Sequence, residues 1–392
     1  MSDGLIARLD RAHALIESGR IDDAVGLLSQ LMDQPPDNVE YWFTLGQAQG
    51  MLGRDAEAEA AFVRAAQLRP EMHEAHLNLA LSRAYQQKLR DSIPSFVAAR
   101  RLKPDSPGLD KTLLDILQSV LQQEGGGPAN RMQLGALGDD PLVSVVVPTR
   151  DRVGLLKDAL ESVARQTYRN WEIIVINDGG EDIAGAIGAL PKDVAAKISA
   201  LRLRTSAGPG HARNRAIEAA RGDVVAFLDD DDLLLPGHLA TLVAGLRASG
   251  AGVAYTLSEK VNERVADGKR LELQRNAVFQ DLSYSRELLL VRNFIPIDNW
   301  GIRRACFEQC GVFDDSLACM EDWDLLLRFS ERSDFHRISK VTAEVRIRKD
   351  ASDSISSRTP ALSTCKLLYG RYPSRGNEWI DLARELYLNA LF

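Results

Sequence analysis

The hydrophobic pattern in the first third of the chain repeats every 34 residues. Segments that begin at Leu5, Val39 and His73 align without gaps. In the second segment, small and apolar residues fall at helical spacing around a turn at Gly53, and these residues are Trp42, Leu45, Gly46, Ala58, Phe62, Ala65 and Pro70. The pattern predicts three helical hairpins, over residues 5–38, 39–72 and 73–106.

A further amphipathic stretch follows the third repeat. Residues 109–123 place Leu113, Leu117 and Leu121 on one side, which predicts a helix that caps the open end of such a stack. Three consecutive glycines at 125–127 then favour a flexible joint. We therefore expect an all-α domain over residues 1–124, followed by a linker over 125–140.

Beyond the linker, short runs rich in β-branched residues alternate with helical patterns. Such runs occur at 143–147, 172–176 and 223–228. Repeated β-α-β units build a parallel sheet, so we expect an α/β domain with a mostly parallel sheet over residues 141–355. Residues 356–392 contain an amphipathic stretch from Trp379, and we expect a helical extension there that packs over the α/β domain, with a partner or a membrane surface as the alternatives.

The predicted strands all end in polar residues. The three ends read Pro-Thr-Arg-Asp at 148–151, Asn-Asp-Gly-Gly at 177–180 and four aspartates at 229–232. In open parallel sheets the ligand crevice lies beyond the carboxyl ends of the strands. Asp229 and Asp231 point the same way in an extended chain, so they could share a divalent cation; a solvated acidic turn is the alternative.

Several other functional classes find little support in the sequence. The glycine-rich stretch at 208–213 lacks the third glycine of a dinucleotide-binding fingerprint, and no Walker loop occurs. The net charge of −7 argues against nucleic acid as a partner. The four cysteines lack the spacing of a zinc site.

The distribution of charge also bears on location. Charged residues interrupt every apolar run, so we expect no transmembrane segment. The first ten residues mix acidic and basic side chains where a secretory signal needs an apolar core. We expect a cytoplasmic protein, with peripheral contact at the inner face of the membrane left open.

Linked motifs in the second domain resemble those of family 2 glycosyltransferases. The motifs are VSVVVPTRD at 143–151, IVINDGG at 174–180, ARN at 212–214, GDVVAFLDDDD at 222–232 and MEDWD at 320–324. Residues 5–106 similarly resemble a tetratricopeptide array. The resemblance implies a GT-A fold, a nucleotide-sugar donor (a UDP-sugar first of all), a Mn²⁺ or Mg²⁺ ion, and transfer with inversion at the anomeric carbon.

The resemblance also implies which residues bind the donor. Carried over by position, Pro148 and Thr149 would line the nucleotide pocket. Asp178 is similar to the family aspartate that hydrogen-bonds the base, and Arg213 would face the base or the diphosphate.

The four aspartates match the acidic motif of the family. Asp229 and Asp230 would lie on the ribose side of the donor, and Asp231 would ligate the metal ion together with Asp229. Where family members often have a histidine near the end of the domain, this chain has Arg348. An arginine cannot ligate a cation but can bind phosphate.

The Glu-Asp motif would supply the base and part of the acceptor site. Asp322 resembles the family's catalytic base, which deprotonates the acceptor hydroxyl, although simple helix capping would also explain an aspartate there. Glu321 and Trp323 beside it would face the acceptor. Trp300 could stack on a sugar or pack in the core.

The resemblance therefore implies a metal-dependent inverting glycosyltransferase. A glycan acceptor in cell-surface polysaccharide assembly is the first expectation. The alternatives are a polypeptide acceptor held by the repeats, or a non-catalytic scaffold that binds nucleotide-sugar. The repeats would then bind a peptide or protein partner, or mediate self-association.

Overall fold

The computed structural model describes residues 3–32, 36–124, 127–128, 130–266, 269–279, 281–348 and 361–391. These residues form two compact units. The first comprises Met1–Gln123 and Asp381–Ala390, and the second comprises Glu124–Ile380 with the last two residues. Parts of the expected linker (125, 126 and 129) and the expected boundary at 355 lie outside the described residues.

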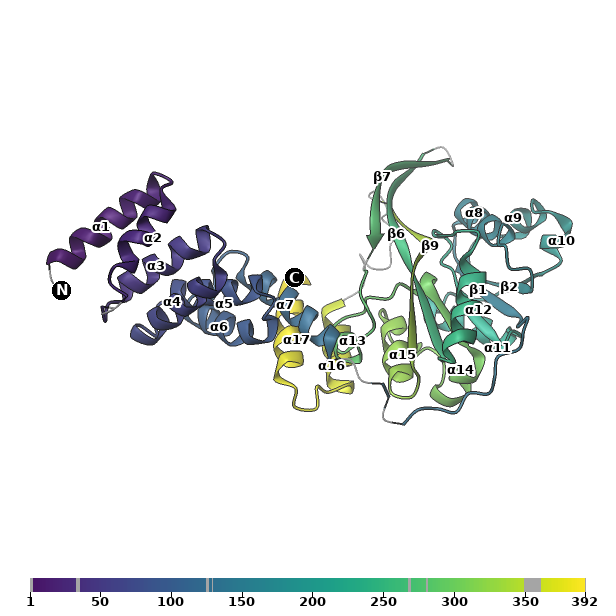
Figure 1. The fold of residues 1–392 in the computed structure, drawn as a ribbon. Helices are drawn as coiled ribbons and strands as arrows, with labels where there is room; N and C mark the ends of the chain where they lie inside the picture. Colours follow the sequence, from purple (N-terminus) through teal and green to yellow (C-terminus); the bar gives the residue numbers. More distant parts are fainter. Residues whose placement is uncertain are drawn as a thin grey trace. The chain divides into compact units, whose positions relative to one another are not determined.

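The first unit is a stack of helices, shown in Figure 1. Successive helices contact one another in antiparallel pairs, as the 34-residue period predicted. The helices are α1 (Asp3–Glu17), α2 (Ile21–Ser29), α3 (Val39–Met51), α4 (Asp55–Leu68), α5 (His73–Tyr85), α6 (Leu89–Leu102) and α7 (Leu109–Gln123). The last of them spans the residues expected of a capping helix.

Small residues explain how these helices approach so closely. A Cβ atom on Gly46 of α3 would lie 2.7 Å from the ring of Phe62 on α4, which is far inside van der Waals contact. Ala58 and Ala65 of α4 are also fully buried. The small residues of the repeat therefore set the spacing between its helices.

The end of the chain belongs partly to this helical unit, and not wholly to the α/β domain as expected. Helix α17 spans Glu378–Leu391, and its residues 381–390 are part of the first unit. Ala383 and Leu386 are buried, and Arg100 on α6 bridges Asp110 and Glu385 at 2.8 Å each. Residues 361–380 belong instead to the second unit.

The second unit contains a nine-stranded mixed sheet. The strand order is β3-β2-β1-β4-β8-β6-β9-β5, with β7 paired to β6. The strands are β1 (Val143–Thr149), β2 (Trp171–Asn177), β3 (Ile198–Arg202), β4 (Val224–Phe227), β5 (Leu233–Leu234), β6 (Val253–Ala266), β7 (Lys269–Phe279), β8 (Trp300–Arg303) and β9 (Phe335–Arg348). The first four strands are parallel, which confirms the predicted α/β sheet.

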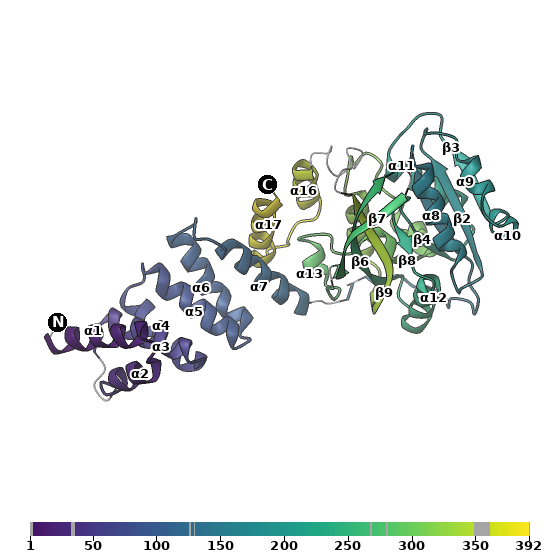
Figure 2. The same ribbon diagram turned by 90° about the horizontal axis from the view of Figure 1, so that it is seen from above.

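Helices cover both faces of the parallel half of the sheet. One face packs against α8 (Val153–Ala164) and α12 (His238–Ser249), and the other contacts α11 (Pro209–Ala219). Figure 2 shows β2 and β3 toward one end of this sheet. Burial on both faces explains why these strands are continuous apolar runs.

The antiparallel half of the sheet was not predicted. β6 and β7 form a long hairpin that reaches past the rest of the sheet (Figure 1). Its buried side includes charged residues, such as Glu263, which is fully buried and pairs with Arg270 and Arg346. Because charges replace apolar residues here, the hydrophobic alternation that identifies a strand is missing.

The strand order reverses at β1, which has β2 on one side and β4 on the other. Such a reversal opens a crevice beyond the carboxyl ends of the strands. The polar strand ends that the sequence singled out are therefore brought together at this edge.

Candidate active site

A cleft of about 780 Å³ lies at this edge of the sheet. Its lining comes from the ends of β1, β2 and β4, from the start of α11, and from the start of α15 (Glu321–Ser330). Nine of the residues expected to form the site line it, and they are Pro148, Thr149, Asp178, Arg213, Asp229, Asp230, Asp231, Glu321 and Asp322. Trp300 and Trp323 do not line it.

Asp178 lies at the end of β2 and holds the next loop. Its carboxylate accepts hydrogen bonds from the Ser206 hydroxyl at 2.7 Å and from the backbone N–H groups of Ala207 and Gly208 at 2.9 and 3.1 Å. Gly179 makes this approach possible, since a Cβ atom there would lie 2.9 Å from the Ser206 nitrogen. Asp178 thus connects the strand end with the loop that leads into α11.

Two arginines converge on the middle of the acidic turn. Asp230 accepts hydrogen bonds from Thr149 at 2.7 Å and from Arg152 at 3.1 Å. Asp231 accepts from Arg152 and from Arg348, each at 3.0 Å. Burial and the charge of Asp231 raise the pKa of Asp230 to about 6, although Arg152 and Thr149 act in the opposite direction.

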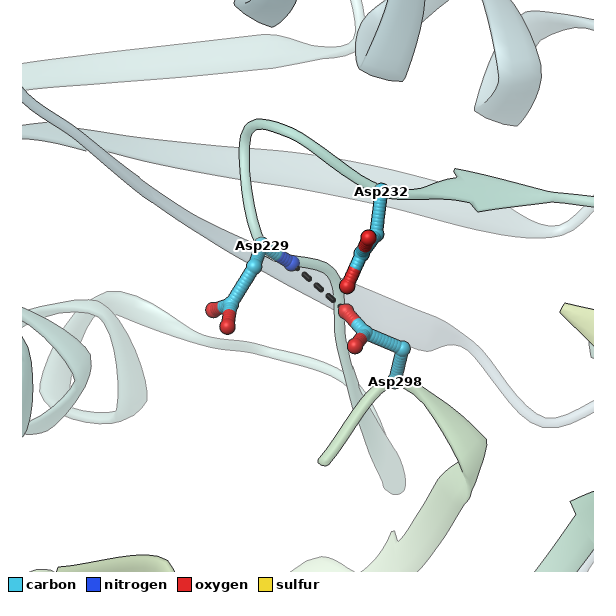
Figure 3. A group of neighbouring side chains, drawn as sticks. All are labelled: Asp229, Asp232 and Asp298. Atoms are coloured by element: carbon cyan, nitrogen blue, oxygen red, sulfur yellow. Dashed lines mark hydrogen bonds between the residues drawn. The ribbon is translucent and has the colours of Figure 1, made fainter. Parts of the chain in front are cut away.

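The other two aspartates of the turn meet a residue from a distant segment. Oxygens of Asp229, Asp232 and Asp298 lie within 4.8 Å of one another. Figure 3 shows Asp232 and Asp298 pointing toward each other, whereas the Asp229 carboxylate points away. Burial raises the pKa of both Asp232 and Asp298, as does the proximity of other carboxylates. Both carboxyl groups therefore bind a proton more readily than an isolated aspartate does.

The Asp232–Asp298 pair fixes the backbone of the turn. Asp298 accepts a hydrogen bond from the Asp229 N–H at 2.7 Å, and Asp232 accepts one from the Arg346 N–H at 2.6 Å. Neither carboxylate lines the cleft, while those of Asp229 and Asp231 do. Carboxylate oxygens are suitable ligands for Mg²⁺ or Mn²⁺. Asp229 belongs to the group of three that lies close enough to hold an ion, whereas Asp231 lines the cleft with its carboxylate bound by Arg152 and Arg348.

Arg213 joins the acidic turn to the Glu-Asp motif. Its guanidinium donates to Asp229 and to Glu321, each at 2.6 Å, and its side chain is almost fully buried. Burial opposes its charge, but the carboxylates of Asp229 and Glu321 more than compensate, so the pKa of Arg213 is raised. In this structure Arg213 therefore links two motifs of the site.

Asp322 lies in the first turn of α15. Its two carboxylate oxygens accept hydrogen bonds from the Asn293 amide and from the Trp323 N–H, both at 2.8 Å. Burial and the neighbouring Glu321 raise the pKa of Asp322 to about 7, while Arg213 acts to lower it. Met320 is the N-cap residue of α15 and Asp322 lies within its first turn, where the carboxylate accepts from the Trp323 N–H and the residue also lines the cleft.

The two tryptophans lie in the core. Trp300 is fully buried against Phe227 and donates its indole N–H to the Ile295 carbonyl at 3.0 Å. Trp323 is 2% exposed and donates to the Leu289 carbonyl at 2.7 Å. As placed, neither ring is available to an acceptor, because both are enclosed by protein and anchored through their nitrogens.

Some residues of the site were missed by the sequence analysis. Arg152 follows the end of β1 by only three residues, so its place next to the strand end was a usable signal. Asp298 and Asn293 carry no such signal, because each reaches the site through long-range packing.

Comparison with known proteins agrees with this geometry. Residues 144–311 match the family model of Glycosyl transferase family 2, and residues 9–73 match a tetratricopeptide repeat model. The chain contains a glycosyltransferase family 2 domain. This glycosyltransferase domain follows an N-terminal region of tetratricopeptide repeats.

Two relatives of the glycosyltransferase domain are bacterial proteins. An uncharacterized glycosyltransferase of Bacillus subtilis, YwdF, is 28% identical over 199 residues, which cover 51% of this chain and 70% of that protein. The O-antigen biosynthesis protein RfbC of Myxococcus xanthus is 29% identical over 233 residues, 57% of this chain but 17% of RfbC. The matched region spans only 33% and 22% of two further curated relatives.

A solved structure shares the fold. The mannosyltransferase PcManGT of Pyrobaculum calidifontis, solved with GDP-mannose and Mn²⁺, superposes with a TM-score of 0.50 at 16% identity. The match covers 76% of this chain and 81% of that one. In the part of the chain that the structure describes, no helix has the length and apolar character needed to cross a membrane.

Proposed function

We propose that the glycosyltransferase domain transfers a sugar from a nucleotide-sugar to an acceptor hydroxyl, with a divalent cation and with inversion at the anomeric carbon. One observation carries the proposal. Both sets of carboxylates, the acidic turn and the Glu-Asp pair, line a single cleft although they lie about ninety residues apart in the sequence.

The acidic turn would hold the diphosphate end of the donor. Asp229 and Asp231 are the residues that would hold Mn²⁺ or Mg²⁺. Such an ion neutralises the negative charge that grows on the departing nucleoside diphosphate. Arg152 and Arg348 already contact Asp231, and their charges would remain close enough to attract the phosphates.

The nucleoside end would occupy the other side of the cleft. Pro148 and Thr149 line it at the end of β1, and Asp178 offers carboxylate oxygens at the end of β2. Because Asp178 is occupied by three donors from the 206–208 loop, a base that hydrogen-bonds to it must exchange with at least one of them.

Asp322 would be the general base. A base must lie at the cleft and have a proton affinity suited to neutral pH. Asp322 meets both conditions, since it lines the cleft and its pKa is raised by burial and Glu321 to about 7. In its ionised form it would accept the proton of the acceptor hydroxyl as that oxygen attacks the anomeric carbon.

A glycan is the acceptor that the relatives favour, because RfbC is described as an O-antigen biosynthesis protein. The repeats make a polypeptide acceptor the alternative, since helical arrays commonly hold peptides. A non-catalytic scaffold is disfavoured, because both carboxylate sets are retained at the cleft. We place the enzyme in the cytoplasm, with peripheral contact at the inner face of the membrane as the alternative.

Thermal unfolding against a donor panel tests this proposal. UDP-, GDP- and dTDP-sugars are added with and without Mn²⁺. A ligand at a hundred times its Kd stabilises the native state by about 2.7 kcal/mol, so one nucleotide class should raise the midpoint by several degrees, and more with Mn²⁺.

Two variants make the panel specific. Asp231→Asn should lose the Mn²⁺-dependent part of the shift, whereas Asp139→Asn, at a fully exposed carboxylate, should retain it. If no donor raised the unfolding midpoint, the result would contradict the proposal. A rise that is the same with and without Mn²⁺, and the same in Asp231→Asn, would also contradict it.

A further inference from the structure

Helix α16 (Ala361–Arg371) packs on the segment that carries Asp322. That segment, residues 314–324, leads from a turn at Asp314 into the first turn of α15. It lies beyond residue 311, where the match to the glycosyltransferase family model ends. The contacts of α16 therefore lie outside the residues that the family model matches.

Arg371 connects both ends of this segment. One nitrogen, Nη1, donates to Asp314 at 2.9 Å and to Asp324 at 2.7 Å. The cleft-lining residues 318–322 lie between these two anchors. A hydrogen bond from Ser316, followed by the one from Arg371, lowers the pKa of Asp314, so Asp314 is charged in this bridge.

Two further contacts from α16 reach the middle of the segment. The Cys319 thiol donates to the Thr364 hydroxyl at 3.4 Å, and the sulfurs of Cys365 and Met320 lie 3.5 Å apart. Met320 has a φ of 60°, in the left-handed region that non-glycine residues rarely occupy. Such a conformation persists only where the surrounding structure holds it, and α16 supplies part of that support.

Asp324 would keep two hydrogen-bond donors if Arg371 were replaced. This carboxylate is fully buried, but it also accepts from Arg328 at 2.9 Å and from the Tyr372 hydroxyl at 2.8 Å. Removing Arg371 therefore leaves no unpaired buried charge. The change should loosen the segment without unfolding the domain.

We propose that Arg371 is a positioning residue for Asp322: by bridging Asp314 and Asp324, it holds the segment that presents the base to the cleft. This inference rests on the proposed function, in which Asp322 is the base. A base displaced by even about 1 Å can lose on the order of a hundredfold in rate, so holding this segment matters for turnover more than for donor binding.

The pH dependence gives the proposal a signature. The charged groups that act on Asp322 are Glu321, Arg213 and Asp229, and burial has the largest effect on its pKa. The base works in its ionised form, so the rate should rise as pH increases through about 7. When the segment loosens, water reaches Asp322, its pKa falls, and the rising limb moves to lower pH.

The experiment compares Arg371→Met with two other variants of the full chain. Arg371→Lys is the rescue, because both hydrogen bonds come from one nitrogen, which an ammonium can replace. Arg375→Met is the matched control, since Arg375 forms an exposed ion pair with Glu331. The readouts are hydrogen exchange of residues 314–324, UDP binding with Mn²⁺, and nucleoside diphosphate release from the donor found in the panel, as a function of pH.

Arg371→Met should raise exchange in 314–324 and lower kcat by on the order of ten- to a hundredfold. UDP affinity should stay within about threefold, and the rising limb should shift by on the order of one pH unit to lower pH. Arg371→Lys should restore most of the rate, and Arg375→Met should match the wild type.

Unchanged exchange or an unchanged rate in Arg371→Met overturns the proposal. So does a lower rate with an unshifted pH profile and no rescue by lysine, because a merely structural role would give that result. A wild-type protein that releases no nucleoside diphosphate from any donor overturns the proposed function and this inference together. Wild-type activity that Arg371→Met retains overturns this inference alone.

Discussion

Arg213 is a buried guanidinium shared by two carboxylates from distant parts of the chain. The sequence identifies Arg213, Asp229 and Glu321 as site residues because each falls in a recognisable motif. It does not reveal their contact, since Arg213 and Glu321 are separated by 108 positions and the fold alone brings them together. The roles of Trp300 and Trp323 were also not predictable from the sequence. An aromatic side chain is compatible with both a core position and a sugar-binding position, and only its burial in the fold distinguishes the two.

The buried ion pairs of Arg213 predict a loss of stability when this single residue is replaced. Arg213→Met would leave Asp229 and Glu321 facing each other without their shared cation, and breaking a buried pair of this kind costs about 3–5 kcal/mol. Denaturant unfolding of the full chain should show the loss. The control is Arg215→Met on the same helix, where an exposed pair with Glu218 is worth at most about 1 kcal/mol. Equal stability of the two variants would contradict the account.

The elements of the fold differ in how far the sequence predicts them. The helical repeats were predicted because a 34-residue period recurs, and the first strands because they are buried on both faces and so are continuous apolar runs. The β6–β7 hairpin was not, because Glu263 and Arg270 replace apolar residues on its buried side, where Glu263 also pairs with Arg346 of β9. Here ion pairs occupy buried positions that apolar residues fill in the other strands. The sequence of the hairpin therefore lacks the apolar alternation that would predict a strand.

The close packing of α3 against α4 predicts opposite effects on stability for two glycine substitutions in α3. Gly46→Ala in α3 would press a Cβ atom into the Phe62 ring, an overpacking that costs about 1–3 kcal/mol. Gly50→Ala on the same helix meets only Ala58 at 3.8 Å and should stabilise the helix by up to about 1 kcal/mol. Hydrogen exchange of α3 and α4 should move in opposite directions in the two variants. Faster exchange in both, or in neither, would count against this packing.

The whole chain comprises two compact units, and its last helix contributes residues to both. The repeat pattern predicted the first unit and the motif order predicted the second. The membership of residues 381–390 in the helical unit was not predictable, because an amphipathic helix shows that it must pack but not against which surface. The chemistry proposed for this chain belongs to the second unit, where all residues of the cleft lie.

Turnover by Asp322→Asn is the most direct test of that chemistry. The substitution keeps the shape of the side chain but removes the proton acceptor, so release of nucleoside diphosphate from the preferred donor should fall by on the order of a hundred- to ten-thousandfold. Binding of the same donor with Mn²⁺ should stay close to that of the wild type, as should the thermal midpoint. An Asp322→Asn variant that binds its donor and turns it over at nearly the wild-type rate would contradict the central claim that Asp322 is the base of a glycosyl transfer.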